Sequence, residues 1–404
     1  MMSASGLPGK RVDAYLAGMI AITFNEIMVQ VSPKTIKLLL FKKKKPLLFE
    51  LALILVDRIG PVTAKNLIAT CGSAEQVFRE KPATLKTLLD NDIDVLDITK
   101  GRTLQRAHEE LLFTEKNNIS IVCYNQPNYP QKLKHCDDSP ILLFTKGNSH
   151  LNPPRAISIV GTRGISEYGR EICKQIIAGL STYQPVIVSG LARGADTLAH
   201  KLALENNLET FAVVAHSLDR VYPVENRELA RQIAENGQLI SEHFSGSKPD
   251  KENFPKRNRI VAGISSTTIV IETAVKGGSM ITASLAADYS RDVMAVPGRV
   301  TDNRFSGCNL LIASNKAAIY TGIDELIRWL GWEEKKKSNT QQALLFELSE
   351  EESVIVNYLK SKGQTQIDTI SLDIQWPLSK LNARLLEMEL KGLLKTHPGK
   401  VFSL

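Results

Sequence analysis

The sequence of 404 residues predicts an α/β fold, in which a doubly wound, mostly parallel sheet is preceded by a helical module and followed by a small domain. Short, fully apolar stretches alternate with helical stretches between residues 155 and 324. This pattern is typical of a parallel sheet covered by helices on both faces. The hydrophobic content of 43% and charged content of 23% are those of a globular chain and exclude wholesale disorder.

The central domain is expected at residues 119–330, and it begins with a lead-in segment, 119–154, that opens on a strand at Ile119–Tyr124. Its apolar runs predict six further strands, at Ala156–Val160, Val186–Ser189, Phe211–Ala215, Leu239–Ser241, Thr268–Glu272 and Val293–Val296. Between them, helices are expected near 169–182, 195–206, 226–235, 280–289 and 308–314.

The two ends of the chain predict separate modules. Residues 1–45 form an extension without a clear pattern, and residues 46–118 are expected to be helical. The turn Arg58-Ile59-Gly60-Pro61 between two amphipathic runs fits a helix-hairpin-helix, whose backbone amides can hold a DNA phosphate, and equally a plain helical hairpin. A polar linker, 331–343, leads to a domain at 344–404 with three helical segments and a hairpin at 393–403.

The composition excludes several kinds of site. The five cysteines are scattered without zinc or redox spacing, and the histidines lack zincin spacing, so neither a metal nor another cofactor is expected. The scattered cysteines and the lack of a signal-peptide cleavage site after the apolar run at 10–24 predict a cytoplasmic protein. Four lysines interrupt the apolar run at 38–56, so no membrane partner is expected.

Net charge alone does not indicate a nucleic-acid partner. The formal charge is +7, but residues 1–60 contribute most of it, with nine Lys or Arg against four Asp or Glu. Residues 151–330 hold 20 against 18, and residues 343–404 hold seven against eight. A polyanion that bound to the central domain would therefore need locally clustered cations.

Glycine-bearing turns follow three of the predicted strands. They contain Gly161 and Gly164, then Gly190 and Gly194, then Gly277-Gly278-Ser279 at the start of a helix. Glycine allows close approach of backbone to an anion, and helix N-termini favour phosphate, so we expect a phosphate-binding floor rather than turns alone. The glycine spacing after the predicted strand Ala156–Val160 is not that of a dinucleotide fingerprint, and no Walker pattern is present.

A basic segment between the predicted strands Leu239–Ser241 and Thr268–Glu272 supplies the candidate cations. Lys256, Arg257, Asn258 and Arg259 follow Phe254 closely. Arg and Lys match backbone phosphates, and Phe254 offers a face for a base, whereas a solvated charged turn is the simpler alternative. Elsewhere, Glu272 is expected to accept hydrogen bonds from loop amides, and His200 is expected to be structural.

With these segments in place, the chain resembles the bacterial DNA-processing protein A family (DprA, also called Smf). The matching stretches are SIVGTR (158–163), VSGLARGADTLAH (188–200), LDRVYPVENRELA (218–230), LISEHFSG (239–246), NFPKRNRIVAG (253–263), IETAVKGGSMITA (271–283), AVPG (295–298) and SGCNLLI (306–312). The family's glycine-rich turn before the Tyr-Pro motif is replaced here by Ala215-His216-Ser217.

The resemblance implies a Rossmann-like domain that binds single-stranded DNA as a dimer, a helical N-terminal module of the SAM or helix-hairpin-helix kind, and a C-terminal winged helix. It implies that the protein is not an enzyme. The implied role is to protect incoming strands and to help load the RecA recombinase onto them in natural transformation and recombination. The DNA contacts it implies are Gly161, Arg163, Gly190, Gly194, Arg227, Lys256, Arg257, Arg259, Gly278 and Ser279. The basic segment itself adds Phe254 and Asn258 to the expected contacts.

Two other classes of protein stay open at this point. One is a nucleotide-processing enzyme similar to the phosphoribohydrolases, although their proline-glycine-glycine signature is missing because Val275-Lys276 precedes Gly277. The other is a winged-helix transcription factor. The slightly acidic C-terminal domain argues against strong duplex binding, and we expect it mainly to contact protein.

Overall fold

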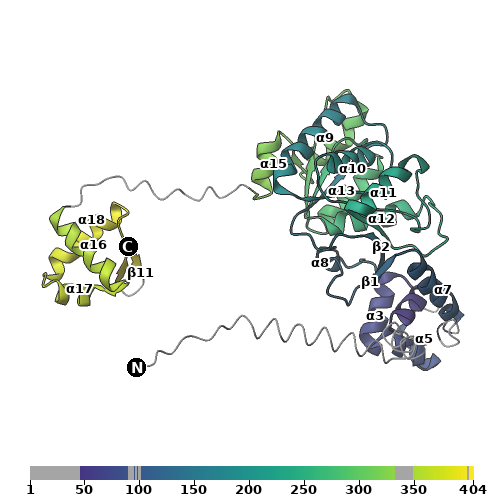
Figure 1. The fold of residues 1–404 in the computed structure, drawn as a ribbon, viewed down its shortest axis with the longest axis horizontal. Coiled ribbons are helices and arrows are strands. Elements are labelled where there is room, and N and C mark those ends of the chain that lie inside the picture. The colour runs from purple at the N-terminus through teal and green to yellow at the C-terminus, as the bar shows by residue number, and fades with distance from the viewer. Residues whose placement is uncertain (1–45, 90–94, 96–97, 99–101, 333–348, 398–399) are drawn as a thin grey trace, which may run out of the picture. The chain divides into compact units, whose positions relative to one another are not determined.

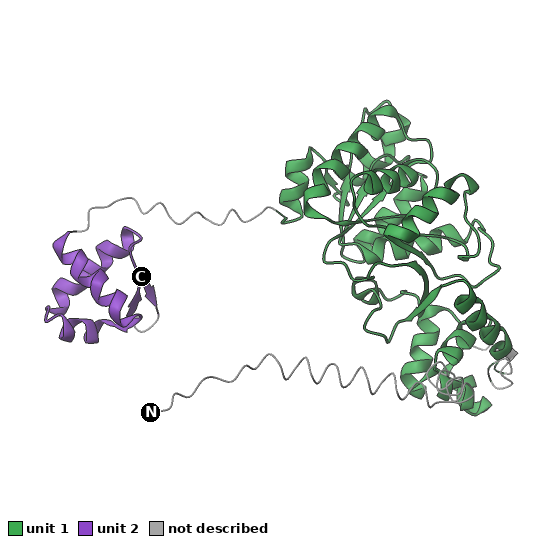
Figure 2. Ribbon diagram, viewed as in Figure 1, with its two compact units in different colours: residues 1–332 green, residues 333–404 purple. Residues whose placement is uncertain are grey.

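The computed structural model describes residues 46–332, apart from 90–94, 96–97 and 99–101, and residues 349–404, apart from 398–399. The chain divides into two compact units, 1–332 and 333–404 (Figure 2). The predicted extension at 1–45 and most of the predicted linker lie outside the described residues.

The larger unit is built on a nine-stranded sheet in the order β1-β2-β6-β5-β4-β3-β7-β8-β9. The seven strands from β6 to β9 pair in parallel, whereas β1 and β2 add an antiparallel edge beyond β6. The strands are β1 Ser120–Cys123, β2 Leu142–Gly147, β3 Ala156–Val160, β4 Val186–Ser189, β5 Thr210–Val213, β6 Gly237–Ser241, β7 Thr267–Val270, β8 Asp292–Ala295 and β9 Ala318–Ile319. The predicted doubly wound, mostly parallel fold is confirmed.

Helices cover both faces of this sheet, because neighbouring side chains of each parallel strand enter different apolar cores. In β3, Ala156 and Val160 pack into one core, and Ile157 and Ile159 pack into the other. The first core is closed by α12 to α14 and the second mainly by α9, α10 and α15 (Figure 1). The helices are α9 Glu167–Leu180, α10 Ala195–Glu205, α11 Arg227–Asn236, α12 Asn253–Ile264, α13 Gly278–Asp288, α14 Ser306–Ala313 and α15 Ile323–Trp329.

The sequence predicted no secondary structure for the basic segment, and it forms the first half of α12, which runs from Asn253 to Ile264. The alternative of a solvated charged turn is therefore wrong. The apolar residues Ile260, Val261 and Ile264 bury the second half of that helix in the core. Strands β2 and β9 were not predicted; β9 has only two residues, too few to show a period in the sequence.

The helical N-terminal module packs around its own apolar core at one end of the larger unit (Figure 1). It contains helical residues 46–54, α3 Pro61–Cys71, α4 Ala74–Arg79, α5 Pro82–Leu88 and α7 Arg102–Lys116. Gly60 caps α3 and Pro61 occupies its first turn, so a turn does join two helices here. Whether that turn holds a phosphate stays a prediction.

The smaller unit has the element order of a winged helix. It contains α16 Glu350–Lys362, β10 Thr365–Gln366, α17 Ile367–Asp373, α18 Leu378–Leu390, β11 Lys395–His397 and β12 Val401–Ser403. The three strands form one antiparallel sheet in the order β10-β12-β11. A capping box between Ser349 and Glu352 begins α16, and the three helices share an apolar core. The predicted winged helix is confirmed.

Candidate nucleic-acid interface

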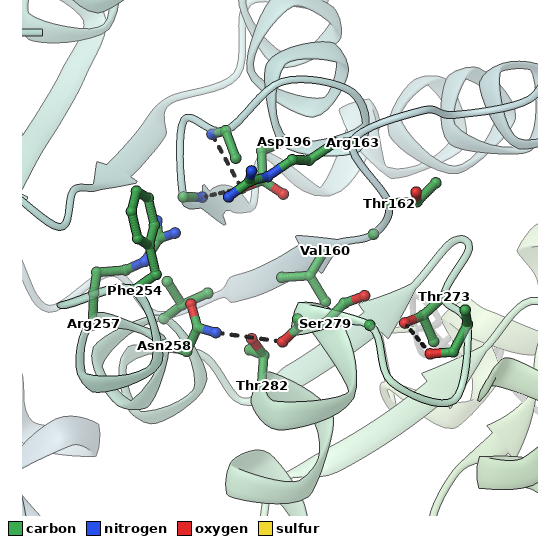
Figure 3. A pocket seen from close by; sticks show the side chains of 17 residues that line it. Val160, Thr162, Arg163, Asp196, Phe254, Arg257, Asn258, Thr273, Ser279 and Thr282 are labelled. Atoms are coloured by element: carbon green, nitrogen blue, oxygen red, sulfur yellow. Dashed lines mark hydrogen bonds between the residues drawn. The ribbon is translucent and has the colours of Figure 1, made fainter. Parts of the chain in front are cut away.

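A pocket of about 370 Å³ lies beyond the carboxyl ends of the parallel strands, and we call it the glycine pocket. This is the edge at which open α/β sheets bind their ligands. Figure 3 shows Phe254, Arg257 and Asn258 on one helix, with Ser279 and Thr282 on the next. The lining residues are Val160, Gly161, Thr162, Arg163, Gly190, Ala192, Asp196, Phe254, Arg257, Asn258, Val261, Thr273, Ala274, Gly277, Gly278, Ser279 and Thr282.

The floor of the glycine pocket is made of backbone. Gly277 is the N-cap of α13, and Gly278 and Ser279 form its first turn, where amide N–H groups have no acceptor within the helix. These groups and the helix dipole favour an anion. At Gly161, a Cβ would meet the Cβ of Ala195 at 2.7 Å, so the first turn can pack against the start of α10 only as glycine. The prediction of converging glycine turns therefore has a geometric basis.

Arg163 is the exposed cation of the glycine pocket. Its guanidinium carbon lies 5.7 Å from the ring centroid of Phe254, which is a cation–π distance. Among the described residues, no hydrogen bond or ion pair engages this guanidinium, so its donors are available to a ligand. A planar donor fork beside an aromatic face is suited to a phosphate and an adjoining base.

The helical conformation of α12 divides the basic segment between two faces. Phe254, Arg257, Asn258 and Val261 follow each other at helical spacing and line the pocket, whereas Lys256 and Arg259 lie on other faces of α12. Arg259 forms an ion pair with Glu242 and donates to the carbonyl of Asp138. Consecutive cations thus do not act together, because a helix turns about 100° per residue.

Arg257 lines the pocket but is buried and already bonded. Its Nη1 donates to the Val213 carbonyl at 2.5 Å, and burial lowers its pKa while the nearby Asp196 carboxylate raises it. Asp196 in turn accepts hydrogen bonds from the amides of Gly190 and Ala192, at 3.2 and 3.3 Å. Asp196 therefore holds the second glycine turn in place, and a Cβ on Gly190 would lie 1.9 Å from the Nη1 of Arg257.

The structure does not bring every predicted contact to the pocket. Gly194 is the N-cap of α10 and Arg227 the first residue of α11, and neither lines the pocket; the same is true of Lys256 and Arg259. DNA contact by these four residues stays a prediction. The pocket does contain the predicted residues Gly161, Arg163, Gly190, Phe254, Arg257, Asn258, Gly278 and Ser279.

Several lining residues were missed by the sequence reasoning. Thr162, Thr273 and Thr282 contribute hydroxyls, and Asp196 orients the second turn. Lys276 is exposed in the loop whose residues Thr273, Ala274, Gly277 and Gly278 line the pocket. A lysine inside a glycine-rich turn was the available signal for this cation.

A second hollow of about 330 Å³ adjoins the glycine pocket, and we call it the Tyr222 hollow. Arg163, Gly190, Ala192 and Phe254 line both spaces, so the Arg163–Phe254 pair stands between them. The remaining lining residues are Gly164, Arg193, Val214, Ala215, His216, Tyr222 and Pro223.

Glu272 and His200 have structural environments. Glu272 is buried and accepts hydrogen bonds from the amide and hydroxyl of Ser166, at the start of α9, which confirms the predicted bonding to a loop amide. His200 is fully buried, its Nδ1 lies 2.7 Å from the Thr210 hydroxyl, and burial lowers its pKa to about 3. Among the described residues, no group of three His, Cys, Asp or Glu side chains could hold a metal, and no helix is long and apolar enough to cross a bilayer.

The fold and pocket define an anion-binding Rossmann-like protein that carries a winged helix. Comparison with known proteins is specific: residues 120–331 match the DNA recombination-mediator protein A family, and residues 339–400 match the DprA winged helix domain. The chain therefore belongs to the DNA recombination-mediator protein A family, whose members are DNA-processing recombination mediators.

Relatives and solved structures agree with this assignment. The DNA processing protein DprA of Streptococcus pneumoniae is 40% identical over 49% of this chain and 70% of its own length. A putative DNA processing protein DprA of Mycobacterium tuberculosis is 32% identical over 86% of this chain and 88% of its own. The X-ray structure of the Streptococcus pneumoniae protein superposes with a TM-score of 0.60 and 30% identity, over 70% of this chain and 95% of that one.

Proposed function

We propose that this protein binds single-stranded DNA in the glycine pocket, with little sequence preference. Phosphates lie against the first turn of α13 and the guanidinium of Arg163, and a base stacks beside Phe254. The observation that carries the proposal is the unengaged Arg163 guanidinium, 5.7 Å from the Phe254 ring, above a floor of glycine backbone.

The preference for single strands follows from the aromatic wall. A base can stack on Phe254 only if its face is free, whereas the faces of duplex bases are covered by their neighbours. Sequence readout would need side-chain donors and acceptors free to meet base edges. Asp196 and Arg257 are instead bonded within the protein, and the Nδ2 of Asn258 lies 3.4 Å from the Gly278 carbonyl.

The winged helix is proposed as a protein contact rather than a duplex reader. The cations of α18 and its C-cap are neutralised, since Lys380 and Arg384 pair with Glu351, and Lys391 pairs with Glu352. A recognition helix would need such cations free to contact phosphate. This pairing counts against the alternative of a winged-helix transcription factor.

Family membership supports the remaining parts of the proposal. The protein protects strands and helps load the RecA recombinase during DNA uptake and recombination in the cytoplasm, and it does so as a homodimer without catalysis. Exposed Ile319 on the edge strand β9 and exposed Leu310 on α14 offer apolar contacts for a second copy. A phosphoribohydrolase-like enzyme would need Glu272 as a free carboxylate, but Glu272 accepts a hydrogen bond from the amide of Ser166.

Titration of the full chain with labelled oligo-dT, at two salt concentrations and with duplex of the same length as competitor, tests the proposal. Tight, salt-dependent binding that duplex displaces poorly is the expected result. Equal or stronger competition by duplex would overturn the single-strand assignment, and steady release of base from nucleoside monophosphates would support an enzyme instead.

A further inference from the structure

The Tyr222 hollow has walls suited to a flat, π-rich ring. The rings of Tyr222 and Phe254 lie on adjoining walls, with centroids 6.1 Å apart and an interplanar angle of 62°. Tyr222 is 44% exposed, so its ring has surface available to a ligand. Val214, Ala215 and Pro223 add apolar surface. Such walls favour stacking and edge contacts with a ring over contact with a charged phosphate.

A cation is present at the boundary of the Tyr222 hollow. Arg163, which lies over the ring of Phe254, lines this hollow as well as the glycine pocket. Arg193, the other cation of the hollow, is already paired with Glu225 at its exposed rim. A nucleotide whose base enters the hollow can therefore keep its phosphate near Arg163.

The wall that carries Tyr222 is held in place by His216. The buried imidazole accepts the Tyr222 amide at Nε2, 3.2 Å away, and its Nδ1 donates to the Ser217 carbonyl at 2.8 Å. Both bonds fit a single neutral tautomer, and burial lowers the pKa of His216, which favours that form. The Ser241 hydroxyl at the end of β6 donates to the His216 carbonyl at 2.6 Å. The wall is therefore preformed, which reduces the ordering cost of binding.

We propose that the Tyr222 hollow is a second nucleobase subsite, which receives the base next to the nucleotide held in the glycine pocket. The inference rests on the proposed function and extends it by assigning Tyr222 to contact with a second base, on the other side of the Arg163–Phe254 pair from the glycine pocket. To place neighbouring bases in two subsites on either side of Arg163, the strand must unstack these bases from each other. An unpaired strand can do so without breaking base pairs.

Binding of Tyr222→Ala and Tyr222→Phe variants of the full chain to oligo-dT, and to an abasic oligonucleotide of equal length, tests the subsite. Tyr222→Ala is expected to weaken oligo-dT binding by roughly 5- to 150-fold, the range for loss of one stacked base, and to leave abasic binding and the salt slope unchanged. Tyr222→Phe keeps the ring and is expected to bind oligo-dT within about twofold of the parent. Val224→Ala removes an exposed side chain outside the hollow and is the matched control.

The outcomes separate this inference from the function on which it rests. Undiminished oligo-dT binding by Tyr222→Ala, while Arg163→Ala still weakens it, would overturn the subsite alone. Equal losses on oligo-dT and abasic strands would also overturn it, because the effect would then not concern a base. If neither Arg163→Ala nor Tyr222→Ala weakened binding, the DNA site itself would be wrong.

Discussion

Replacing Arg163 by alanine removes the one cation that lines both the glycine pocket and the Tyr222 hollow and has no hydrogen-bond or ion-pair partner among the described residues. A charge-assisted hydrogen bond to phosphate contributes about 1.5–3 kcal/mol. Loss of that bond is expected to weaken oligo-dT binding by roughly 10- to 150-fold. The log–log salt slope should also fall by about 0.7, since one phosphate contact on a single strand is lost.

Fluorescence anisotropy with labelled oligo-dT at several salt concentrations measures both quantities. Arg163→Lys retains the charge but not the planar fork beside Phe254, so it should preserve the slope while binding more weakly than the parent. Arg231→Ala is the matched control, because Arg231 is also exposed but pairs with Glu228 and Glu235 on α11, outside both spaces. Parental affinity and slope in Arg163→Ala would refute the reasoning.

Three further predictions concern the framework of the pocket. Gly190→Ala places a Cβ 1.9 Å from an Nη of Arg257 and should lower the free energy of urea unfolding by about 1–3 kcal/mol. Gly278→Ala, whose Cβ meets nothing within 4 Å, should cost far less, and equal losses in the two variants would contradict the steric argument. Arg259→Ala leaves Glu242, whose side chain is 15% exposed, without its ion-pair partner and should cost about 3–5 kcal/mol of stability, while the folded protein still binds oligo-dT. A selective loss of binding without destabilisation would instead indicate that Arg259 contacts DNA. The pKa of His200 is about 3 in the folded protein against an ordinary 6.5, so this group lowers the stability by about 1.4 kcal/mol per pH unit as the pH falls below 6.5. Between pH 7 and pH 5, His200→Gln should therefore lose less unfolding free energy than the parent. Equal losses in the two proteins would show that His200 is not the titrating group.

The parallel core of the fold could be predicted because its strands are apolar on both faces. Runs such as Ala156–Val160 and Val186–Ser189 match β3 and β4 in both bounds, since nothing competes with burial to define where such strands begin and end. The antiparallel edge formed by β1 and β2 was not foreseen as an edge, because strand order depends on pairing between segments far apart in the sequence. Phe144 in β2 pairs with Ser241 in β6.

The candidate site could be predicted in its glycine turns and only partly in its cations. Turn glycines are local features that adjoin strand ends, so topology alone brings Gly161, Gly190 and Gly278 together. Whether a cation faces the pocket depends on the rotation of the element that carries it. The polar start of α12, with Pro255 inside its first turn, obscured the helix, and so Arg257 and Arg259 could not be assigned to different faces.

Helix α12 carries Phe254 into the glycine pocket and the Tyr222 hollow, and it contacts the lead-in segment through Arg259 and Gly263. The same helix therefore connects the candidate site to the lead-in segment. A Cβ at Gly263 would meet Leu133 at 2.6 Å, so α12 packs closely against α8, Gln131–Lys134. We expect substitutions that shift α8 to move α12, and with it Phe254 on the opposite face of that helix. Substitutions in α8 are therefore expected to weaken the proposed ligand binding, although no residue of α8 lines either the glycine pocket or the Tyr222 hollow.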